Sequence, residues 1–361
     1  MVDALKLNGK IPQSPDEWDV LAKMAQEQPP LKGPNNHNYI VRIGECWFKI
    51  RIPIPNRLEM DLHRLPEYRV QKFLYDQHLN VPNIFHFSES PPYQVQEYLP
   101  VPVLDHLYPR GSRLPEHYIG DVVEFLSRLY SLSTDWLLPY FDNWPVDGDT
   151  SGFLDRITRS TVGIYNRYFS KYHELYRQLG IPNDIVSLLY QINEPLTPRS
   201  FVLCHSDIHR KNCLLVGKTS WFIDWEMALF GDPGFDVGVH LSKVEYLPDE
   251  EDRFLELITK KLDRKHQIGI VNDSQVYKKH AFVKSVIVHA VRYHKLISER
   301  SDSSTLSDLA LKYENKLARA VPIIGNKPLR APEIERIFVN YINNESCASP
   351  PVGPALDGAS E

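Results

Sequence analysis

The sequence predicts a mixed α+β fold with two lobes: a small N-lobe built on an antiparallel sheet with one key helix, and a larger, mainly helical C-lobe. Strand-like apolar runs and one helical pattern occupy residues 39–98, whereas helical periodicity dominates from residue 115 onward. A length of 361 residues is sufficient for two lobes with a large core.

The elements of the N-lobe follow from apolar periodicity and from turn residues. Gly44-Glu45 lies between two apolar runs, which predicts a hairpin. Pro66 suits the first turn of a helix whose buried stripe is Val70, Phe73 and Leu74. The predicted elements are a helix over 18–24, a turn-rich loop over 33–38, strands over 39–43 and 46–52, a helix over 66–77, and strands over 84–87 and 93–98.

In the C-lobe, apolar residues at 122, 125, 126 and 129 form one face of a helix with a period of 3.6 residues. We assign residues 1–98 to a nucleotide-binding N-lobe, 99–105 to a linker, 106–345 to the C-lobe, and the proline-rich stretch 346–361 to a disordered tail. The predicted helices of the C-lobe cover 118–132, 152–178, 183–192, 235–246, 250–262, 276–297 and 304–320.

Composition argues against several classes of protein. A net charge of −5 gives no support for a nucleic-acid binder, which is usually basic. No stretch has the length of a membrane span, and the N-terminus has no apolar signal segment, so we expect a cytoplasmic enzyme without a membrane partner. Four cysteines, none in a C-x-x-C pair, predict neither a disulfide framework nor a zinc site. Nothing in the sequence indicates the oligomeric state.

The strongest functional signal is a set of three polar residues between apolar strand-like runs. Asp207 and Asn212 lie five residues apart on one predicted loop, and a hairpin over 214–223 returns Asp224 to that loop. Phosphoryl transfer from a metal-bound nucleotide to a hydroxyl uses such a set, because one carboxylate takes the proton of the acceptor while an amide and a second carboxylate hold Mg²⁺. The alternative, that the first two residues only cap turns, does not account for the second aspartate on the returning strand.

This segment resembles the aminoglycoside phosphotransferase family and its relatives, including choline kinases. Their pattern is H-G-D-x-H-x-x-N, then I-D-W-E, then G-D-P-x-x-D; here it occupies residues 205–212, 223–226 and 231–236, with Ser206 in place of the common glycine. The resemblance implies a protein-kinase-like fold, with Asp207 as the catalytic base and Asn212 and Asp224 as magnesium ligands.

The resemblance also implies that Asp232 and Asp236 brace the catalytic loop and cap the next helix, for which a plain turn and N-cap are the alternative. We expect His205 and His209 to hold the loop rather than to exchange protons.

Nucleotide binding is expected in the N-lobe. Lys49, inside a strand that begins with apolar residues, is expected to bind the phosphates of ATP or GTP. Arg51 lies on the same face of the strand and is its rival, and a solvated edge strand is the alternative. Glu67 begins the buried stripe of the following helix, so we pair it with Lys49, because a buried carboxylate needs a cation.

Two further nucleotide contacts are expected. The loop over 33–38 resembles the G-x-x-N loop of the family and would lie over the phosphates, with Asn35 and Asn36 at its centre, although ordinary turn chemistry explains it almost as well. Residues 96–99 would form a hinge that binds the purine through the backbone groups of Glu97 and Leu99.

The acceptor is expected to be a small molecule, because only seven residues separate Asp224 from Asp232 and leave no room for a peptide-presenting loop. Asp249, Glu250 and Glu251 are the candidate contacts for the ammonium groups of an aminoglycoside, although acids at a helix start are stabilising without any ligand. We predict an ATP- and Mg²⁺-dependent O-phosphotransferase for an aminoglycoside or another antibiotic, with a role in resistance. A metabolite kinase for choline, a sugar or an amino alcohol, and a pseudokinase-like binding module, are the alternatives.

Overall fold

A computed structural model of the chain describes residues 2–3, 10–33, 35–55, 60, 62, 65–299 and 303–348. The chain divides into two compact units. The first unit comprises residues 1–157 and 194–278, and the second comprises residues 158–193 and 279–361. The predicted mixed α+β class is confirmed, with a several-stranded sheet and many helices.

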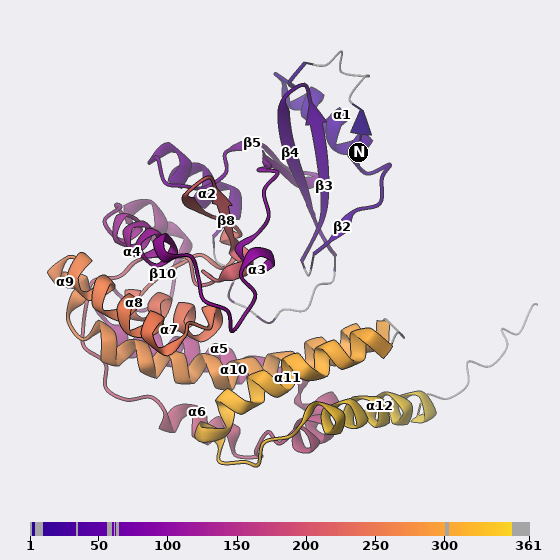
Figure 1. The fold of residues 1–361 in the computed structure, drawn as a ribbon, viewed down its shortest axis with the longest axis vertical. Coiled ribbons are helices and arrows are strands. Elements are labelled where there is room, and N and C mark those ends of the chain that lie inside the picture. The colour runs from indigo at the N-terminus through magenta and orange to yellow at the C-terminus, as the bar shows by residue number, and fades with distance from the viewer. Residues whose placement is uncertain are drawn as a thin grey trace, which may run out of the picture. The chain divides into compact units, whose positions relative to one another are not determined.

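The largest sheet of the first unit has six strands in the order β1-β3-β4-β6-β5, with β2 beside β3 (Figure 1). β3 (Asn36–Ile43) and β4 (Cys46–Pro53) form the predicted hairpin around Gly44, whose φ of +59° suits glycine. The pairing is antiparallel except between β1 and β3. Residues 36–38 begin β3 and are not part of a loop, which corrects the loop predicted over 33–38. The other strands are β1 (Val2–Asp3), β2 (Leu31–Lys32), β5 (Ile84–Glu89) and β6 (Pro92–Glu97).

Two helices accompany this sheet. α1 (Pro15–Ala25) begins at a capping box between Ser14 and Glu17 and buries Trp18, whose ring meets Phe48 of β4 edge to face. α2 (Glu67–Asp76) buries Val70 and Leu74 as predicted.

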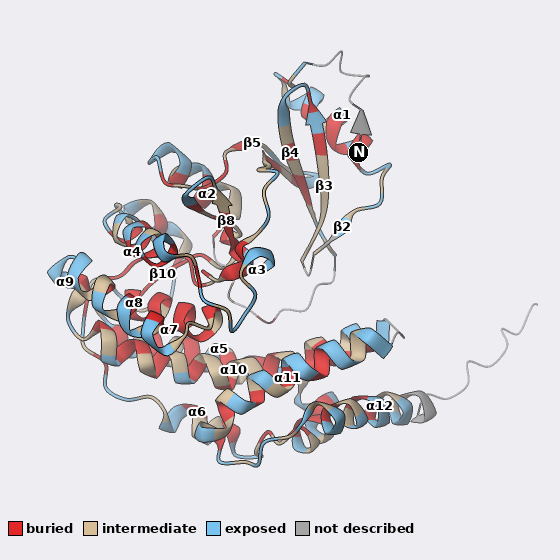
Figure 2. Ribbon diagram, in the orientation of Figure 1, coloured by how far each residue is buried: buried red, intermediate tan, exposed pale blue. Residues whose placement is uncertain are grey.

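The remainder of the first unit is mainly helical, with two small antiparallel sheets. β7 (Val202–Cys204) pairs with β10 (Leu229–Gly231), and β8 (Cys213–Val216) pairs with β9 (Thr219–Phe222) as the predicted hairpin. α7 (Pro233–Val244) is buried along most of its length (Figure 2). The other elements are α3 (Leu104–Leu107), α4 (Glu116–Tyr130), α8 (Pro248–Lys261), α9 (Arg264–Gln267), and the first parts of α5 (Thr150–Gln178) and α10 (Ile270–Glu299).

The second unit is helical in its described residues and contains α6 (Ile185–Gln191), α11 (Ser303–Ile324), α12 (Ala331–Ala348), and the ends of α5 and α10. α12 is missing from the sequence-based prediction; it buries Ile334 and Phe338, and the latter ring packs edge to face on Tyr313 of α11. Of the tail predicted to be disordered, residues 346–348 end α12 and residues 349–361 lie outside the described part. No helix of the described part is long and apolar enough to cross a membrane. The lobe and linker boundaries stay a prediction.

Candidate active site

The loop that carries Asp207 joins β7 to β8 in the first unit and is held by α7. The carboxylate of Asp236, in the first turn of α7, accepts hydrogen bonds from the backbone N–H of His205 (3.0 Å) and of Ser206 (2.7 Å). Ser206 has a φ of +64°, a left-handed conformation that favours glycine. This conformation gives a physical reason for the glycine that the family pattern has at this position.

Asp232 anchors the start of α7. Its carboxylate accepts from the backbone N–H of Gly234 (2.9 Å), from Nε of the buried Arg199 (2.6 Å) and from the hydroxyl of Tyr277 (2.9 Å). Asp236 therefore braces the loop and Asp232 caps α7, as the resemblance implies.

Asp207 has a different partner on each carboxylate oxygen. Oδ2 accepts from Nδ2 of Asn212 at 2.9 Å. Oδ1 forms an ion pair with Nζ of Lys243, and Nε2 of His209 lies 3.5 Å away. Burial alone would raise the pKa of Asp207, but the charges of Lys243 and His209 outweigh it and hold that pKa well below its usual range.

His205 ties this loop to the strand that precedes Asp224. Its Nδ1 accepts from the N–H of Asp207 (3.2 Å), so Nε2 carries the proton and donates to the carbonyl of Ile223 (3.2 Å). Burial lowers the pKa of His205 to about 4, which keeps the ring neutral at pH 7. A second link is the backbone N–H of Ile223, which donates to the carbonyl of Asn212 (3.0 Å). These contacts agree with the holding role expected for His205.

Arg210, between Asp207 and Asn212, points away from both and is 1% exposed. Its guanidinium donates five hydrogen bonds, one for each N–H that it has, and all five acceptors are backbone carbonyls. The acceptors are the carbonyls of Tyr108, Pro109, Ser112, Val244 and Glu245.

Arg51, and not Lys49, is the ion-pair partner of Glu67. Nη1 of Arg51 contacts Glu67, and Nη2 lies 3.1 Å from Oδ1 of Asp224. The planar guanidinium presents its donors in a fixed fork, so Nη1 and Nη2 reach two different carboxylates. The predicted Lys49–Glu67 pair is therefore wrong, and the rival residue takes that place.

Asp224 lies with two other carboxylates in a compact acidic cluster. One oxygen each of Glu67, Asp224 and Glu226 lie within 4.8 Å of one another. Burial, and then repulsion by Asp224 and Glu67, raises the pKa of Glu226 to about 7. Three carboxylates around one guanidinium leave a surplus of negative charge, and oxygen ligands are what Mg²⁺ prefers. The residues present thus fit a divalent cation.

Asn212 and Asn35 have defined roles beside this cluster. Nδ2 of Asn212 donates to Asp207, which leaves its amide oxygen for a cation. Asn35 donates from Nδ2 to Oε1 of Glu226 at 2.6 Å, while Asn36 begins β3 opposite Pro53. Glu226 is a cluster member that the sequence analysis misses, although it lies two residues after Asp224 in the same motif.

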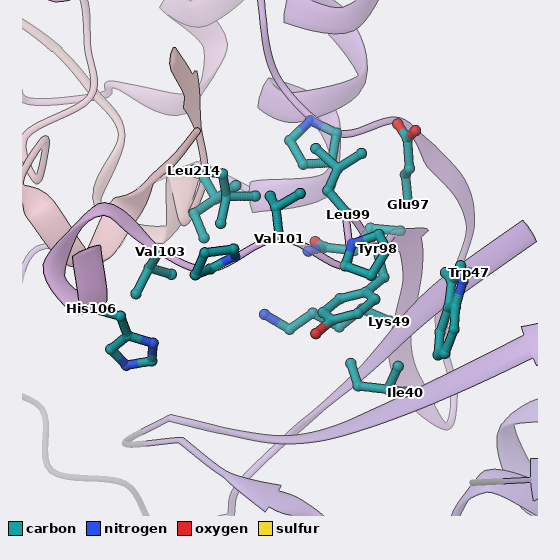
Figure 3. A pocket seen from close by; sticks show the side chains of 15 residues that line it. Ile40, Trp47, Lys49, Glu97, Tyr98, Leu99, Val101, Val103, His106 and Leu214 are labelled. Carbon is teal, nitrogen blue, oxygen red and sulfur yellow. The ribbon is translucent and has the colours of Figure 1, made fainter. Parts of the chain in front are cut away.

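A cavity of about 650 Å³ lies along β4 and the segment that follows β6 (Figure 3). The side chain of Lys49 lines it, and burial followed by the charge of Arg51 lowers the pKa of Lys49 to about 8. Glu97 and Leu99, the predicted hinge residues, also line the cavity; Glu97 is fixed by hydrogen bonds to the backbone of Asn83. Lining residues without a predicted role include Ile40, Trp47, Val103, His106, Leu214 and Ile223.

The three acids predicted to bind an acceptor have partners inside the protein. Asp249 pairs with Arg113 (2.7 Å), and Glu251 pairs with Lys278. Glu250 is buried and accepts from the N–H groups of Leu114 (2.8 Å) and of Leu247 (2.9 Å) at the start of α8. The helix terminus and these basic neighbours account for the acidic run without a ligand. A role of the three acids in binding an acceptor stays a prediction.

Known proteins resemble this chain in sequence. The profile of the phosphotransferase enzyme family matches residues 27–260. Protein LicA of Haemophilus influenzae is 25% identical over 143 residues, which is 38% of this chain and 41% of that protein; for the protein of strain Rd the share is 52%. The matched stretch thus spans about half or less of these curated relatives.

Solved structures are similar over most of the chain. A choline/ethanolamine kinase family protein from Mesorhizobium loti has a TM-score of 0.54 at 15% identity, covering 90% of this chain and 99% of that one. Choline kinase LicA from Streptococcus pneumoniae has a TM-score of 0.54 at 14% identity, covering 86% and 99%. The gentamicin–APH(2")-IIa complex has a TM-score of 0.51 at 15% identity, covering 90% and 99%. These matches establish the kinase-like fold predicted from the sequence.

Proposed function

Because this chain belongs to the phosphotransferase enzyme family, we propose that it transfers the terminal phosphoryl group of ATP or GTP to a hydroxyl of a small molecule, with Mg²⁺ as the metal cofactor. The observation that carries this proposal is the placement of Asp207. One of its oxygens is held by Asn212. The carbonyl of Asn212 and the ring of His205 are both hydrogen-bonded to the backbone of Ile223, which precedes Asp224 of the acidic cluster.

The cavity lined by Lys49, Glu97 and Leu99 would take the nucleotide. Its apolar walls suit a flat purine, and the backbone of residues 97–99 offers hydrogen-bonding groups that are common to many sequences. Lys49 and Arg51 both lie on one face of β4, so they would supply positive charge to the phosphates. In this scheme residues 1–98 are the nucleotide lobe, 99–105 the linker and 106–345 the acceptor lobe.

The amide oxygen of Asn212 and the carboxylates of Asp224 and Glu226 would hold the cation. When bound, Mg²⁺ supplies charge neutralisation for the phosphate oxygens. Glu67 stays with Arg51 as the brace of that guanidinium.

The transfer itself needs little from the protein besides position and a proton acceptor. The acceptor oxygen forms a bond to the terminal phosphorus while the bond to the leaving diphosphate oxygen breaks, and the hydroxyl proton goes to Oδ1 of Asp207. A carboxylate of low pKa suits this role, because in a loose transition state the proton leaves late and the main task is to orient the hydroxyl. The products are a phosphate monoester and the nucleoside diphosphate.

The acceptor class is open to two proposals from the similar structures, antibiotics and amino alcohols, since these include a gentamicin complex and choline kinases. The acids that favour an aminoglycoside have internal partners, so that preference loses its support in this chain. An ATP-consuming reaction would place the enzyme in the cytoplasm.

The test is nucleotide turnover by Asp207→Asn beside the wild type, with Asp252→Asn as a matched control on the exposed side of α8. We expect Asp207→Asn to bind nucleotide normally but to lose transfer by about 10²–10⁴-fold, the usual size of base and positioning effects. The control should keep wild-type rates. Equal turnover in the wild type and Asp207→Asn would mean that the protein binds nucleotide but does not catalyse phosphoryl transfer.

A further inference from the structure

α7 presents three side chains to the catalytic loop from one face. Asp236 binds the backbone of residues 205 and 206, Nδ1 of His240 is 2.9 Å from the carbonyl of Ile208, and Lys243 contacts Asp207. The spacing of four and three residues places these groups along one line of the helix. The position of Lys243 is therefore set by a buried helix that is fixed to the loop at two other points.

The ammonium of Lys243 has capacity for a second anion. It carries three N–H donors, and among the described residues it contacts the carboxylate of Asp207. Its side chain is 38% exposed, against 19% for Asp207, so a solute can reach it. Lys243 thus stands between the catalytic carboxylate and the solvent.

Lys243 lies on the acceptor side of Asp207. Oδ2 is held by Asn212, whose oxygen is left for the metal, so Oδ1 is the oxygen that faces the acceptor hydroxyl. Lys243 contacts that same Oδ1, and Nε2 of His209 lies 3.5 Å from it. A fixed positive charge therefore borders the place that the reacting hydroxyl must occupy.

The acidic residues that follow Lys243 in the sequence pair with other basic side chains, and so they do not offer a cationic ligand a free carboxylate. Glu245 pairs with Arg110 at 2.6 Å, Asp249 with Arg113, and Glu251 with Lys278. A cationic acceptor would be repelled by the ammonium of Lys243 beside the reaction centre, and none of these three acids would be free to bind it. An anionic acceptor would meet an ammonium with spare donors.

We propose that Lys243 makes this enzyme select hydroxyl acceptors that carry a negatively charged group, a carboxylate or a phosphate, next to the hydroxyl that is phosphorylated. This proposal rests on the proposed function and names the acceptor class of the same site. In the complex, Lys243 donates to the anionic group while Oδ1 of Asp207 accepts from the hydroxyl. Amino alcohols and aminoglycosides, whose ammonium groups lie close to their hydroxyls, are disfavoured.

The experiment compares acceptors that share a scaffold and differ in charge. One series is glycerol, glycerate, glycerol 3-phosphate and 3-amino-1,2-propanediol; the other is glucose, glucuronate, glucose 6-phosphate and glucosamine. ADP release by the full chain gives kcat and KM for the wild type, Lys243→Met, Lys243→Arg and the matched control Lys278→Met, which also removes a lysine paired with a carboxylate. The carboxylate and phosphate members of each series separate the two possible anionic groups.

We expect anionic acceptors to have the highest wild-type kcat/KM in at least one series. Lys243→Met should lower that value by about 10- to 100-fold, the range of a hydrogen bond between charged groups, mostly through KM. Lys243→Arg should restore much of the loss, and Lys278→Met should change nothing. The urea midpoint of Lys243→Met checks its folding. The neutral acceptors show how far loss of the ammonium affects Asp207 itself, so each anionic kcat/KM is compared as a ratio to the neutral member of its series.

Three results would overturn the proposal: no turnover of any anionic acceptor, a wild-type preference for the cationic members, or an equal loss of kcat for all acceptors in Lys243→Met. The last result would place the ammonium on the transferred phosphoryl group. ADP release that depends on Asp207, measured in the same assay with neutral acceptors or water, tests the proposed function separately. If that release persists while the charge preference is absent, only the acceptor class is wrong.

Discussion

Replacing Arg210 by methionine should destabilise the first unit, although the substitution removes a buried charge. Replacing a buried ion pair by apolar residues is often neutral or stabilising, because both charges leave the interior together. Arg210 differs in that its five acceptors are backbone carbonyls, which stay behind when the guanidinium is removed. If the cost of burying the charge dominates, Arg210→Met stabilises the protein; if the lost hydrogen bonds to the carbonyls dominate, it destabilises the protein.

The magnitude follows from the count of hydrogen bonds. A net contribution of about 1 kcal/mol for each of five bonds gives about 5 kcal/mol. Two effects reduce this value. Four of the carbonyls are only partly buried, so water can replace the lost donors. Burial of the guanidinium, which also lowers the pKa of Arg210, destabilises the wild-type fold, and the substitution removes that cost. We therefore expect Arg210→Met to lower the free energy of unfolding by about 3–5 kcal/mol. Lys211→Met, an exposed neighbour, should change it by less than about 0.5 kcal/mol.

The assay is urea unfolding followed by tryptophan fluorescence. All six tryptophans lie in the first unit, so the signal is specific to it even if the two units unfold separately. Arg210→Lys provides a graded test, because an ammonium has three donors for the same five carbonyls and should recover part of the loss. A midpoint for Arg210→Met equal to or above that of the wild type would refute the view that the guanidinium stabilises by satisfying those carbonyls.

Two further predictions concern the catalytic loop. Ser206→Gly should raise the free energy of unfolding by about 1 kcal/mol, since glycine adopts the left-handed conformation freely and removes a buried hydroxyl that has no partner in the described residues; urea midpoints check this, and a loss of stability would contradict it. Burial raises the pKa of Asp236 from 3.8 to about 6, so this carboxyl takes up a proton as the pH falls through about 6 and loses acceptor capacity for the loop N–H groups. kcat should therefore decline below about pH 6 and not at the much lower pKa of Asp207; a profile that stays flat down to about pH 5 would exclude this assignment.

The catalytic loop was accessible to sequence reasoning because its geometry is local. Asp207 and Asn212 share one short loop, and the hairpin of β8 and β9 returns Ile223, the residue before Asp224, to the carbonyl of Asn212. The bracing by Asp236 and the capping by Asp232 were implied by the family resemblance, and both residues lie at the start of α7.

The partner of Glu67 was not accessible in this way. Alternation along a strand puts Lys49 and Arg51 on one face, and no local rule decides which of them meets a helix that begins 16 residues later. The acids of α8 illustrate the same limit. A run of negative charge resembles a ligand site until Arg113 and Lys278, remote in sequence, are found beside it.

Neighbouring side chains in residues 205–212 have different partners. His205 binds the carbonyl of Ile223 before Asp224, Asp207 pairs with Lys243, and Arg210 binds the carbonyls of two flanking segments. Because stability rests on the buried Arg210 and acceptor charge on the half-exposed Lys243, substitutions at these two positions should separate the two properties. Acceptor preference can then change without loss of the fold. The kinase-like scaffold and the acceptor class are thus set by different residues, which is why similarity in fold to choline kinases and to an aminoglycoside-binding protein does not decide between their substrates for this chain.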